Sequence, residues 1–231
     1  MKILCTICAR KGSKGLKNKN ILKIKGKPLI EYTLLTSINS KCFDNISVSS
    51  DINFPIKFKN KYKQLYFHKR VKKLSGDNIG KIAVIRNLLE ESERYHKTKY
   101  DIVVDLDITS PLRKEIDIKR ALKTFVDNNY NNLISITESK KNPYFNMIEI
   151  KNNKPNLIKK GKIYLSRQTA PKTYDMNASI YIWKREYLIK NNNLLNKKTG
   201  FYIMPRFRSI DIDDELDFFV SKQIIERNLN K

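Results

Sequence analysis

The sequence predicts an α/β fold in which a mostly parallel sheet carries helices on both faces. Three observations support this prediction: strand-like and helix-like segments alternate up to residue 137, their connections are short, and the strand-like segments are apolar and rich in β-branched residues. The chain has 231 residues, which suits one domain with a sizeable core. We therefore expect a single domain over residues 1–231.

The elements follow in order along this first part of the chain. Strands are expected at residues 1–8, 45–49, 64–67, 100–106 and 132–137, and helices at 28–40, 78–97 and 114–128. Pro28 is tolerated in a first helical turn. Asp77 or Asn78 would cap the second helix, whose apolar residues recur at helical spacing.

The pattern changes after Ser139. Residues 140–185 hold short strand-like pieces broken by Pro143, Gly161 and Pro171, so we expect a small β-rich lobe inserted at about 140–185. Strands at 179–183 and 207–212 and a closing helix at 213–228 would complete the domain.

The chain is strongly basic, with 47 Lys and Arg against 23 Asp and Glu and a formal net charge of +24. This charge suits a nucleic acid or a small anionic substrate equally well. The lysines are scattered and no zinc-finger or RNA-binding signature accompanies them, so we expect no nucleic-acid partner. No apolar run approaches the ~20 residues that span a bilayer, and no signal peptide is recognisable. We expect a cytoplasmic protein without a membrane partner.

Cys5 and Cys8 form a C-x-x-C pair inside the first predicted strand. Side chains three apart on a strand point to opposite faces, so the two sulfurs would not converge on a metal or form a redox pair. We expect buried structural thiols.

The segment after the first strand, residues 9–20, is rich in glycine and basic residues. Gly12 and Gly15 permit tight turns in which backbone N–H groups approach a ligand, and Arg10, Lys14 and Lys19 add positive charge. Open α/β sheets bind ligands at the carboxyl ends of their strands. The segment therefore predicts a triphosphate-binding loop without Walker spacing; the alternative is a solvated basic loop.

Two pairs of aspartates share the same spacing. Asp211 and Asp213 lie on the strand expected at 207–212 and just beyond it, so both carboxylates would face one way and could share a Mg²⁺ ion. The alternative is an acidic first turn of the closing helix. Asp105 and Asp107 end a central strand, where they could approach a second metal or the substrate, although Asp105 could also be structural.

Six sequence blocks occur in an order that resembles the acylneuraminate cytidylyltransferases, which make CMP-activated sialic acids and related nonulosonic acids. The resemblance covers nearly the whole chain. The blocks are C-A-R-K-G-S-K-G from Cys8 with the following K-N-I and G-K-P-L-I, Arg70 with Leu74 and Asp77, T-S-P-L-R from Thr109, R-Q-x-x-P from Arg167, N-A-S-I-Y from Asn177, and D-I-D from Asp211.

Departures from the family pattern refine the expectation. Asp107 and Ile108 stand where sialic-acid enzymes usually have Gln-Pro, and Asn177-Ala178-Ser179 stands where they usually read N-G-A. The runs 3–14, 105–107 and 170–181 look most similar to the bacterial legionaminic-acid branch, whose sugar is a 5,7-diamino relative of sialic acid. Alternatives are a CMP-N-acetylneuraminate synthetase or another CTP-dependent enzyme of the same fold. The block typical of 3-deoxy-octulosonate enzymes is missing.

The resemblance implies a three-layer Rossmann-like nucleotidyltransferase (GT-A-like) fold. It also implies transfer of CMP from CTP to the anomeric hydroxyl of an acidic nine-carbon sugar, with release of pyrophosphate. The family's homodimers imply a dimer, with the lobe at 140–185 reaching into the partner's site. A polyanion-binding module without catalysis is the remaining alternative.

Site roles follow from matching the blocks residue by residue. The expected catalytic residues are Arg10, Lys14 and Lys19. The expected nucleotide-binding residues are Ala9, Arg10, Gly12, Ser13, Lys19, Asn20, Arg70 and Asp77. The expected sugar-binding residues are Asp107, Arg167, Gln168, Tyr174 and Tyr181. The expected ligands of a Mg²⁺ or Mn²⁺ ion are Asp211 and Asp213.

Overall fold

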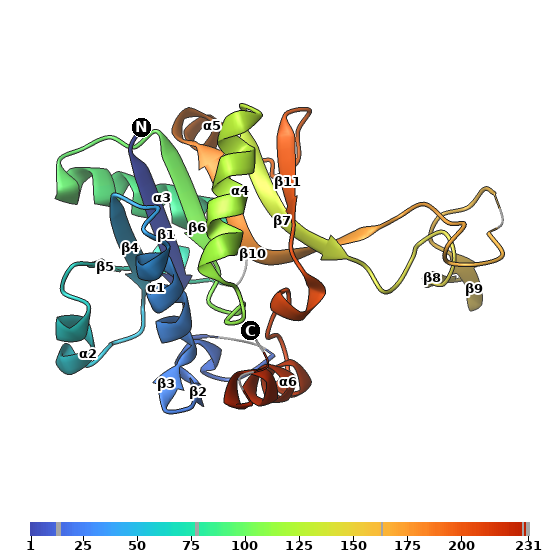
Figure 1. Ribbon diagram of the computed structural model, residues 1–231, viewed down its shortest axis with the longest axis horizontal. Coiled ribbons are helices and arrows are strands. Elements are labelled where there is room, and N and C mark those ends of the chain that lie inside the picture. Colours follow the sequence, from blue (N-terminus) through green and yellow to red (C-terminus); the bar gives the residue numbers. More distant parts are fainter. Residues whose placement is uncertain (13–14, 77–78, 163, 228, 230–231) are drawn as a thin grey trace.

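A computed structural model describes residues 1–12, 15–76, 79–162, 164–227 and 229. These residues form a seven-stranded sheet flanked by helices (Figure 1). In spatial order its strands are β11 (Thr199–Ile203), β7 (Asn132–Glu138), β10 (Tyr174–Lys184), β6 (Ile102–Leu106), β1 (Ile3–Ala9), β4 (Asn45–Ser50) and β5 (Tyr66–Lys69). Two small ladders pair β2 (Lys23–Ile24) with β3 (Lys27–Pro28) and β8 (Ile148–Lys151) with β9 (Lys154–Leu157).

The sheet is mostly parallel, as the alternation of elements predicts. In the described chain, β10 runs antiparallel to its neighbours β6 and β7, whereas the other paired strands of this sheet are parallel. The carboxyl ends of β1, β4, β5 and β6 therefore meet at one edge. Loops that leave this edge are well placed to build a site together.

Helices pack on both faces of the sheet and make three layers. One core joins α1 (Leu29–Ser40) and α4 (Glu115–Asp127) to one face, and the other joins α3 (Lys81–His96) and α5 (Arg185–Lys190) to the opposite face. Cys5 belongs to the first core and Cys8 packs against the second, so the thiols point to opposite faces as expected. Burial raises the pKa of both thiols.

Three parts of the chain differ from the sequence-based expectation. Helix α3 begins at Lys81 with Gly80 as its N-cap, and the expected caps at 77–78 lie outside the described residues. The strand expected at 207–212 is wrong: a 3₁₀ turn, η3 (Arg206–Arg208), and a loop occupy this range. The strand at this edge of the sheet, beside β7, is β11. Its Gly200 makes room for the Tyr130 ring, because a Cβ added at residue 200 would lie 2.1 Å from that ring.

The remaining helices and 3₁₀ turns complete the fold. They are the helices α2 (Ile56–Lys61) and α6 (Glu215–Glu226) and the 3₁₀ turns η1 (Lys19–Ile21) and η2 (Lys72–Leu74). The β8–β9 ladder lies in a lobe that projects away from the sheet, whereas residues 174–184 of the expected lobe form β10 of the main sheet (Figure 1). Among the described residues, no helix combines the length and apolar character needed to cross a membrane.

Candidate active site

A cleft of about 550 Å³ opens at the carboxyl edge of the sheet. Its charged side chains come from the segments after β1, β5 and β6, from the first turn of α3, and from the segment before α6. They are Arg10, Lys19, Arg70, Lys81, Asp107, Asp211 and Asp213. Cations and carboxylates thus face one space, an arrangement that suits a phosphate chain together with a divalent cation.

The loop at 9–20 is tied to its surroundings by backbone contacts. The buried Asn20 side chain donates from Nδ2 to the Arg10 carbonyl at 2.9 Å, and the Lys11 amide donates to Asp51 Oδ1 at 2.7 Å. Asn20 therefore shapes the loop as well as lining the cleft. Ala9 is buried at the end of β1, and Gly12 is exposed. The expected contacts of Ser13, Lys14 and Asp77 lie outside the described residues.

Two contacts join this loop to the segment before α6, which lies far along the sequence. A Cβ added to Gly15 would lie 2.3 Å from the Asp213 carbonyl oxygen, so only glycine permits this close approach. The Lys19 ammonium lies 2.9 Å from Asp213 Oδ1. The predicted anion loop and the predicted metal ligands therefore form one wall of the cleft.

Asp211 and Asp213 do face one cleft, but the expected strand that would align them is wrong. They flank the buried Ile212, whose amide donates to the Thr109 carbonyl at 2.9 Å. Asp213 is exposed, whereas Asp211 is half-buried. A hydrogen bond to the T-S-P-L-R block, rather than strand pairing, holds this segment at the cleft.

The Asp211 carboxyl is the most perturbed acid in the cleft. Burial raises its pKa to about 6, the charges of Asp107 and Asp213 push in the same direction, and a hydrogen bond from Thr109 opposes them. Asp211 Oδ1 is enclosed and has no hydrogen-bond partner among the described residues. A divalent cation would satisfy this oxygen and favour the ionised form, so Asp211 and Asp213 fit a magnesium-type ion.

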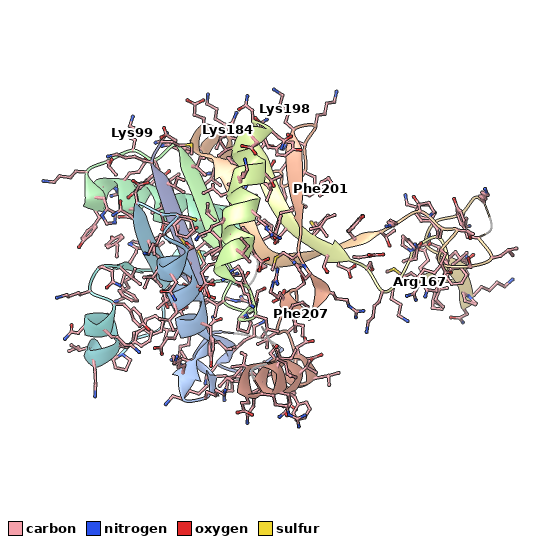
Figure 2. All side chains as sticks on the ribbon, viewed as in Figure 1. Lys99, Arg167, Lys184, Lys198, Phe201 and Phe207 are labelled. Carbon is pink, nitrogen blue, oxygen red and sulfur yellow. The ribbon has the colours of Figure 1, made fainter. Side chains whose placement is uncertain are left out.

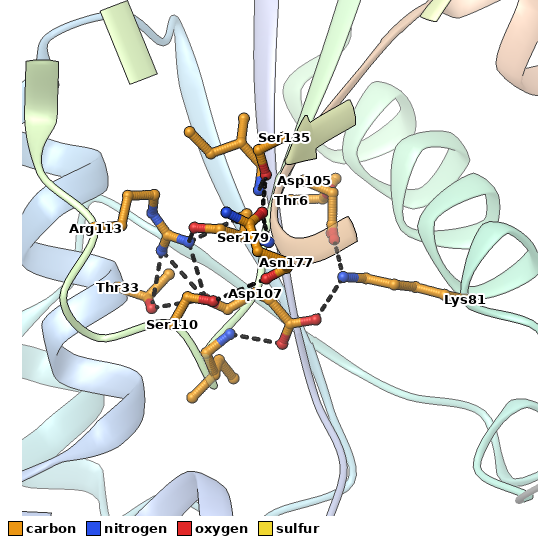
Figure 3. Close-up of polar contacts among 12 residues, drawn as sticks. Thr6, Thr33, Lys81, Asp105, Asp107, Ser110, Arg113, Ser135, Asn177 and Ser179 are labelled. Carbon is orange, nitrogen blue, oxygen red and sulfur yellow. Dashed lines mark hydrogen bonds and ion pairs between the residues drawn. The ribbon is translucent and has the colours of Figure 1, made fainter. Parts of the chain in front are cut away.

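Asp105 and Asp107 have a different environment, although their spacing is the same. The Lys81 ammonium lies 2.8 Å from Asp105 Oδ2 and 2.7 Å from Asp107 Oδ2 (Figure 3). Asp105 is fully buried and also accepts from the Thr6 hydroxyl at 2.8 Å. Burial by itself would raise the pKa of Asp107, but the Lys81 charge and hydrogen bond outweigh it and lower this pKa.

Sequence reasoning missed Lys81. It occupies the first turn of α3, where the helix dipole disfavours a cation, so a compensating partner was needed. That unfavourable position is the signal that could have singled it out.

Arg113, the last residue of the T-S-P-L-R block, is buried beneath the cleft. Its guanidinium donates to the Ser179 carbonyl at 2.7 Å, to the Asp107 carbonyl at 3.2 Å and to the Thr33 hydroxyl at 3.1 Å (Figure 3). Burial lowers its pKa to about 10. Arg113 therefore fixes the backbone that carries Asp107 and does not itself line the cleft.

The residues expected to bind the sugar fall into two groups. Asp107 lines the cleft, and the Tyr181 ring lies beside it with its centroid 4.7 Å from Lys81 Nζ. Arg167 and Gln168 are exposed, and Arg167 lies on the projecting lobe, away from the cleft of the same chain (Figure 2). Tyr174 is exposed at the start of β10. Within one chain the structure does not bring these three residues to the cleft.

Arg70 lines the cleft after β5, and its guanidinium donates to the Ser49 carbonyl at 3.2 Å. It therefore holds the end of β4 while facing the same space as the phosphate loop.

Residues 4–218 match the family of cytidylyltransferases. The chain belongs to this cytidylyltransferase family. It is 45% identical over 228 residues to post-translational flagellin modification protein B of Campylobacter coli, covering 98% of this chain and 97% of the relative. It is also 45% identical over 229 residues to CMP-N,N'-diacetyllegionaminic acid synthase of Campylobacter jejuni, covering 99% and 97%. Pseudaminic acid cytidylyltransferase of the same species is 31% identical over 229 residues, covering 99% and 98%.

Solved structures share the fold of this cytidylyltransferase. CMP:2-keto-3-deoxy-manno-octonic acid synthetase, complexed with CTP, superposes with a TM-score of 0.67 at 15% identity and covers 99% of this chain and 100% of that chain. 4-Diphosphocytidyl-2C-methyl-D-erythritol synthase superposes with a TM-score of 0.68 at 11% identity, covering 97% and 98%. The expected Rossmann-like nucleotidyltransferase fold is confirmed.

Proposed function

We propose that this cytidylyltransferase transfers CMP from CTP to the anomeric hydroxyl of a nonulosonic acid of the legionaminic type, making an activated sugar for surface glycan or flagellin glycosylation. The anomeric hydroxyl releases its proton to solvent as its oxygen forms a bond to the α-phosphorus, the bond from that phosphorus to the oxygen that bridges to the β-phosphate breaks, and pyrophosphate leaves. One observation carries the proposal: cations of the loop at 9–20 and the Asp211–Asp213 segment share one wall of a cleft at the carboxyl edge of the sheet.

The basic residues of the cleft suit the phosphates. Arg10 and Lys19 would bind the triphosphate and stabilise the departing pyrophosphate, since such transfers depend mainly on positioning and on neutralising developing charge. Arg70 would face the nucleoside end. Lys14 and Ser13 stay proposed phosphate contacts, Asp77 stays a proposed nucleoside contact, and all three lie outside the described residues.

The carboxylates suit a Mg²⁺ or Mn²⁺ ion. Asp211 and Asp213 would hold it, with phosphate oxygens and waters as further ligands. When bound, the ion would neutralise phosphate charge and polarise the α-phosphate. Asp107 is left as an acceptor for hydrogen bonds from the sugar, because Lys81 already compensates its charge.

We also propose a homodimer in which the projecting lobe serves the partner's cleft. Arg167 is a suitable bidentate ligand for the sugar carboxylate, and it is exposed on a lobe that leads away from its own cleft (Figure 2). Exposed apolar side chains on β10 and β11, Met176, Phe201 and Ile203, would find cover in such a dimer.

A pyrophosphate-release assay tests the reaction. The purified chain is incubated with CTP, Mg²⁺ and, separately, N,N'-diacetyllegionaminic acid, N-acetylneuraminic acid, pseudaminic acid and 3-deoxy-octulosonate, with ATP and UTP as nucleotide controls. We expect the highest kcat/KM with CTP and the legionaminic acid. Preference for N-acetylneuraminate would reassign the acceptor, and release with none of the four sugars would refute the proposal.

Mixing two inactive variants tests the shared site. Arg167→Ala and Asp211→Asn disable different halves of the proposed composite site, so re-equilibrated mixtures should regain up to about a quarter of the activity through mixed dimers that hold one intact site. Sedimentation must show a dimer for this proposal to stand. A monomer, or a mixture no more active than its components, would place Arg167 outside the site.

A further inference from the structure

We infer that Lys81 is a positioning residue that fixes Asp107 as a hydrogen-bond acceptor for the sugar and keeps the Asp105–Asp107 pair from acting as a second metal site. The inference rests on the proposed function, because it concerns the second substrate of that reaction. The inference extends the proposed function because Lys81 lies outside the six sequence blocks.

The orientation of Asp107 is determined at both of its oxygens. Oδ2 accepts from Lys81 Nζ at 2.7 Å, and Oδ1 accepts from the Ile108 amide at 2.8 Å (Figure 3). The Thr109 amide also donates to this carboxylate, so of its roughly four acceptor positions one stays unused. Asp107 therefore presents fixed, unused acceptor capacity to the cleft that it lines, which suits an N–H or O–H group of the sugar.

Asp105 keeps Lys81 in place. Its side chain is almost completely buried, and it binds the Thr6 hydroxyl through Oδ1 and the Lys81 ammonium through Oδ2. The Tyr181 ring covers another side of the same ammonium, at 4.7 Å from its centroid. Lys81 is thus held by three groups and is not free to swing toward the phosphates.

The charge of the pair also argues against a metal there. One ammonium is shared by two carboxylates, so much of their attraction for a divalent cation is already compensated. Asp211 Oδ1 has no hydrogen-bond partner among the described residues, whereas the Lys81 ammonium lies 2.8 Å from Asp105 Oδ2. We therefore infer that a divalent cation binds at Asp211 and Asp213 and that Asp107 contacts the sugar.

Lys81 also stands where the second substrate has room. It lines the charged cleft and, on its other side, an adjoining hollow of about 430 Å³ that includes Ile82, Tyr181 and Trp183. With the triphosphate beside Arg10 and Lys19, a sugar attacking the α-phosphorus would lie toward this boundary. Asp107 lines the charged cleft and is paired with Lys81 at this boundary.

Steady-state kinetics with both substrates test the inference. Lys81→Met should raise the KM for the preferred sugar at least tenfold and leave the KM for CTP within about twofold, because it removes the group that orients Asp107. Lys81→Arg retains the charge and should recover most of the sugar affinity. Lys123→Met is the matched control: it also removes a Lys–Asp pair, on the exposed face of α4, and should change neither KM.

Two double variants separate positioning from folding and from direct contact. Removing one partner of a buried ion pair destabilises a fold, so Lys81→Met/Asp105→Asn should recover melting temperature without recovering the KM for the sugar. Lys81→Met/Asp107→Asn should raise that KM no further than Asp107→Asn alone.

Four outcomes would overturn the inference. Two of them concern Lys81→Met: an unchanged KM for the sugar, or an equal rise in KM for both substrates. The third is an additive rise in the KM for the sugar in Lys81→Met/Asp107→Asn, and the fourth is recovery of sugar affinity along with stability in Lys81→Met/Asp105→Asn. Each would exclude positioning through Asp107. The wild-type reaction is measured first, so failure of the proposed function is recognised separately: it appears as no pyrophosphate release from the unaltered chain, which removes both proposals.

Discussion

Two aspartate pairs with the same spacing lie at the cleft, which is lined by Asp107 of one pair and by both members of the other, and their environments differ. Asp105 lies in β6 and Asp107 directly after it, and the two share the Lys81 ammonium, Asp105 from the buried side and Asp107 from the cleft. Asp211 and Asp213 stand in a loop, where one has an oxygen without a partner in the described chain and the other is exposed beside Lys19.

The comparison shows that two D-x-D sequences with the same spacing can have different environments. The environment of each carboxylate depends on groups brought from elsewhere in the chain, and we expect it to decide which pair can hold a metal ion. Burial raises the pKa of Asp211 to about 6, whereas the Lys81 charge outweighs burial and lowers the pKa of Asp107. Isosteric substitutions can test whether the two pairs differ in function as they do in environment.

The largest difference is expected between Asp211→Asn and Asp105→Asn. Loss of the Asp211 charge should lower kcat by about 100-fold, since charge stabilisation by a bound metal is worth several kcal/mol. Asp105→Asn should lower kcat by less than about tenfold, because it acts through Lys81. Turnover measured across a Mg²⁺ titration checks both. Equal losses in the two variants would contradict the division of roles.

Lys19→Ala should have the next largest effect. Removing an ammonium that stabilises developing phosphate charge should slow turnover by more than about tenfold. Lys17→Ala, an exposed lysine of the same loop, is the matched control and should stay near the wild-type rate. Single-turnover measurements with saturating CTP would separate chemistry from binding. A Lys19 variant as fast as the Lys17 variant would remove Lys19 from the site.

Gly15→Ala tests the contact that joins the loop at 9–20 to Asp213. Its Cβ would meet the Asp213 carbonyl oxygen, so backbone must shift, and we expect destabilisation by about 1–3 kcal/mol. Turnover should fall about fivefold, which corresponds to a small increase in the activation free energy of the reaction. Thermal unfolding is the measurement. A Cβ at Gly12 would meet no atom within 4 Å, so Gly12→Ala should unfold near the wild-type temperature.

Asp213→Asn should have the smallest effect, because this carboxylate is exposed and its ion pair with Lys19 is screened by water. We expect a shift of about threefold in the Mg²⁺ concentration that gives half-maximal activity, with a smaller change in kcat at saturating metal. The titration distinguishes the two members of the pair. A loss as large as that of Asp211→Asn would make both carboxylates equally necessary.

Much of the fold could be predicted from the sequence because local pattern reflects local structure. Apolar runs identified β1, β4, β6 and β7, and helical periodicity identified α1, α3 and α4 to within a few residues at each end. The strand β11 was missed because Gly200 interrupts its apolar run, although this glycine makes room for the Tyr130 ring. The segment 207–212, wrongly expected as a strand, is held instead by hydrogen bonds that include those from Arg208 to Asp117 and from the Ile212 amide to the Thr109 carbonyl.

The candidate site could be predicted in part. The loop at 9–20 was recognised from its glycines and cations, and the later blocks named Asp107, Asp211 and Asp213, all of which line the cleft. Lys81 was missed because nothing near it in the sequence shows which carboxylates it meets. Arg167 was named, but one chain does not bring it to its own cleft (Figure 2).

The sequence by itself determined the alternation of elements, the basic and glycine-rich character of the first loop and the presence of two equally spaced acidic pairs. These features depend on residues that are neighbours along the chain. Only the tertiary structure decided which cation meets each pair and that Asp211 Oδ1 has no hydrogen-bond partner among the described residues, because the partners come from far away: Lys81 is 26 residues from Asp107, and Lys19 is 194 residues from Asp213. The electrostatic environment of a carboxylate depends on its distance in space from other charges, and for residues far apart in the sequence that distance is set by folding.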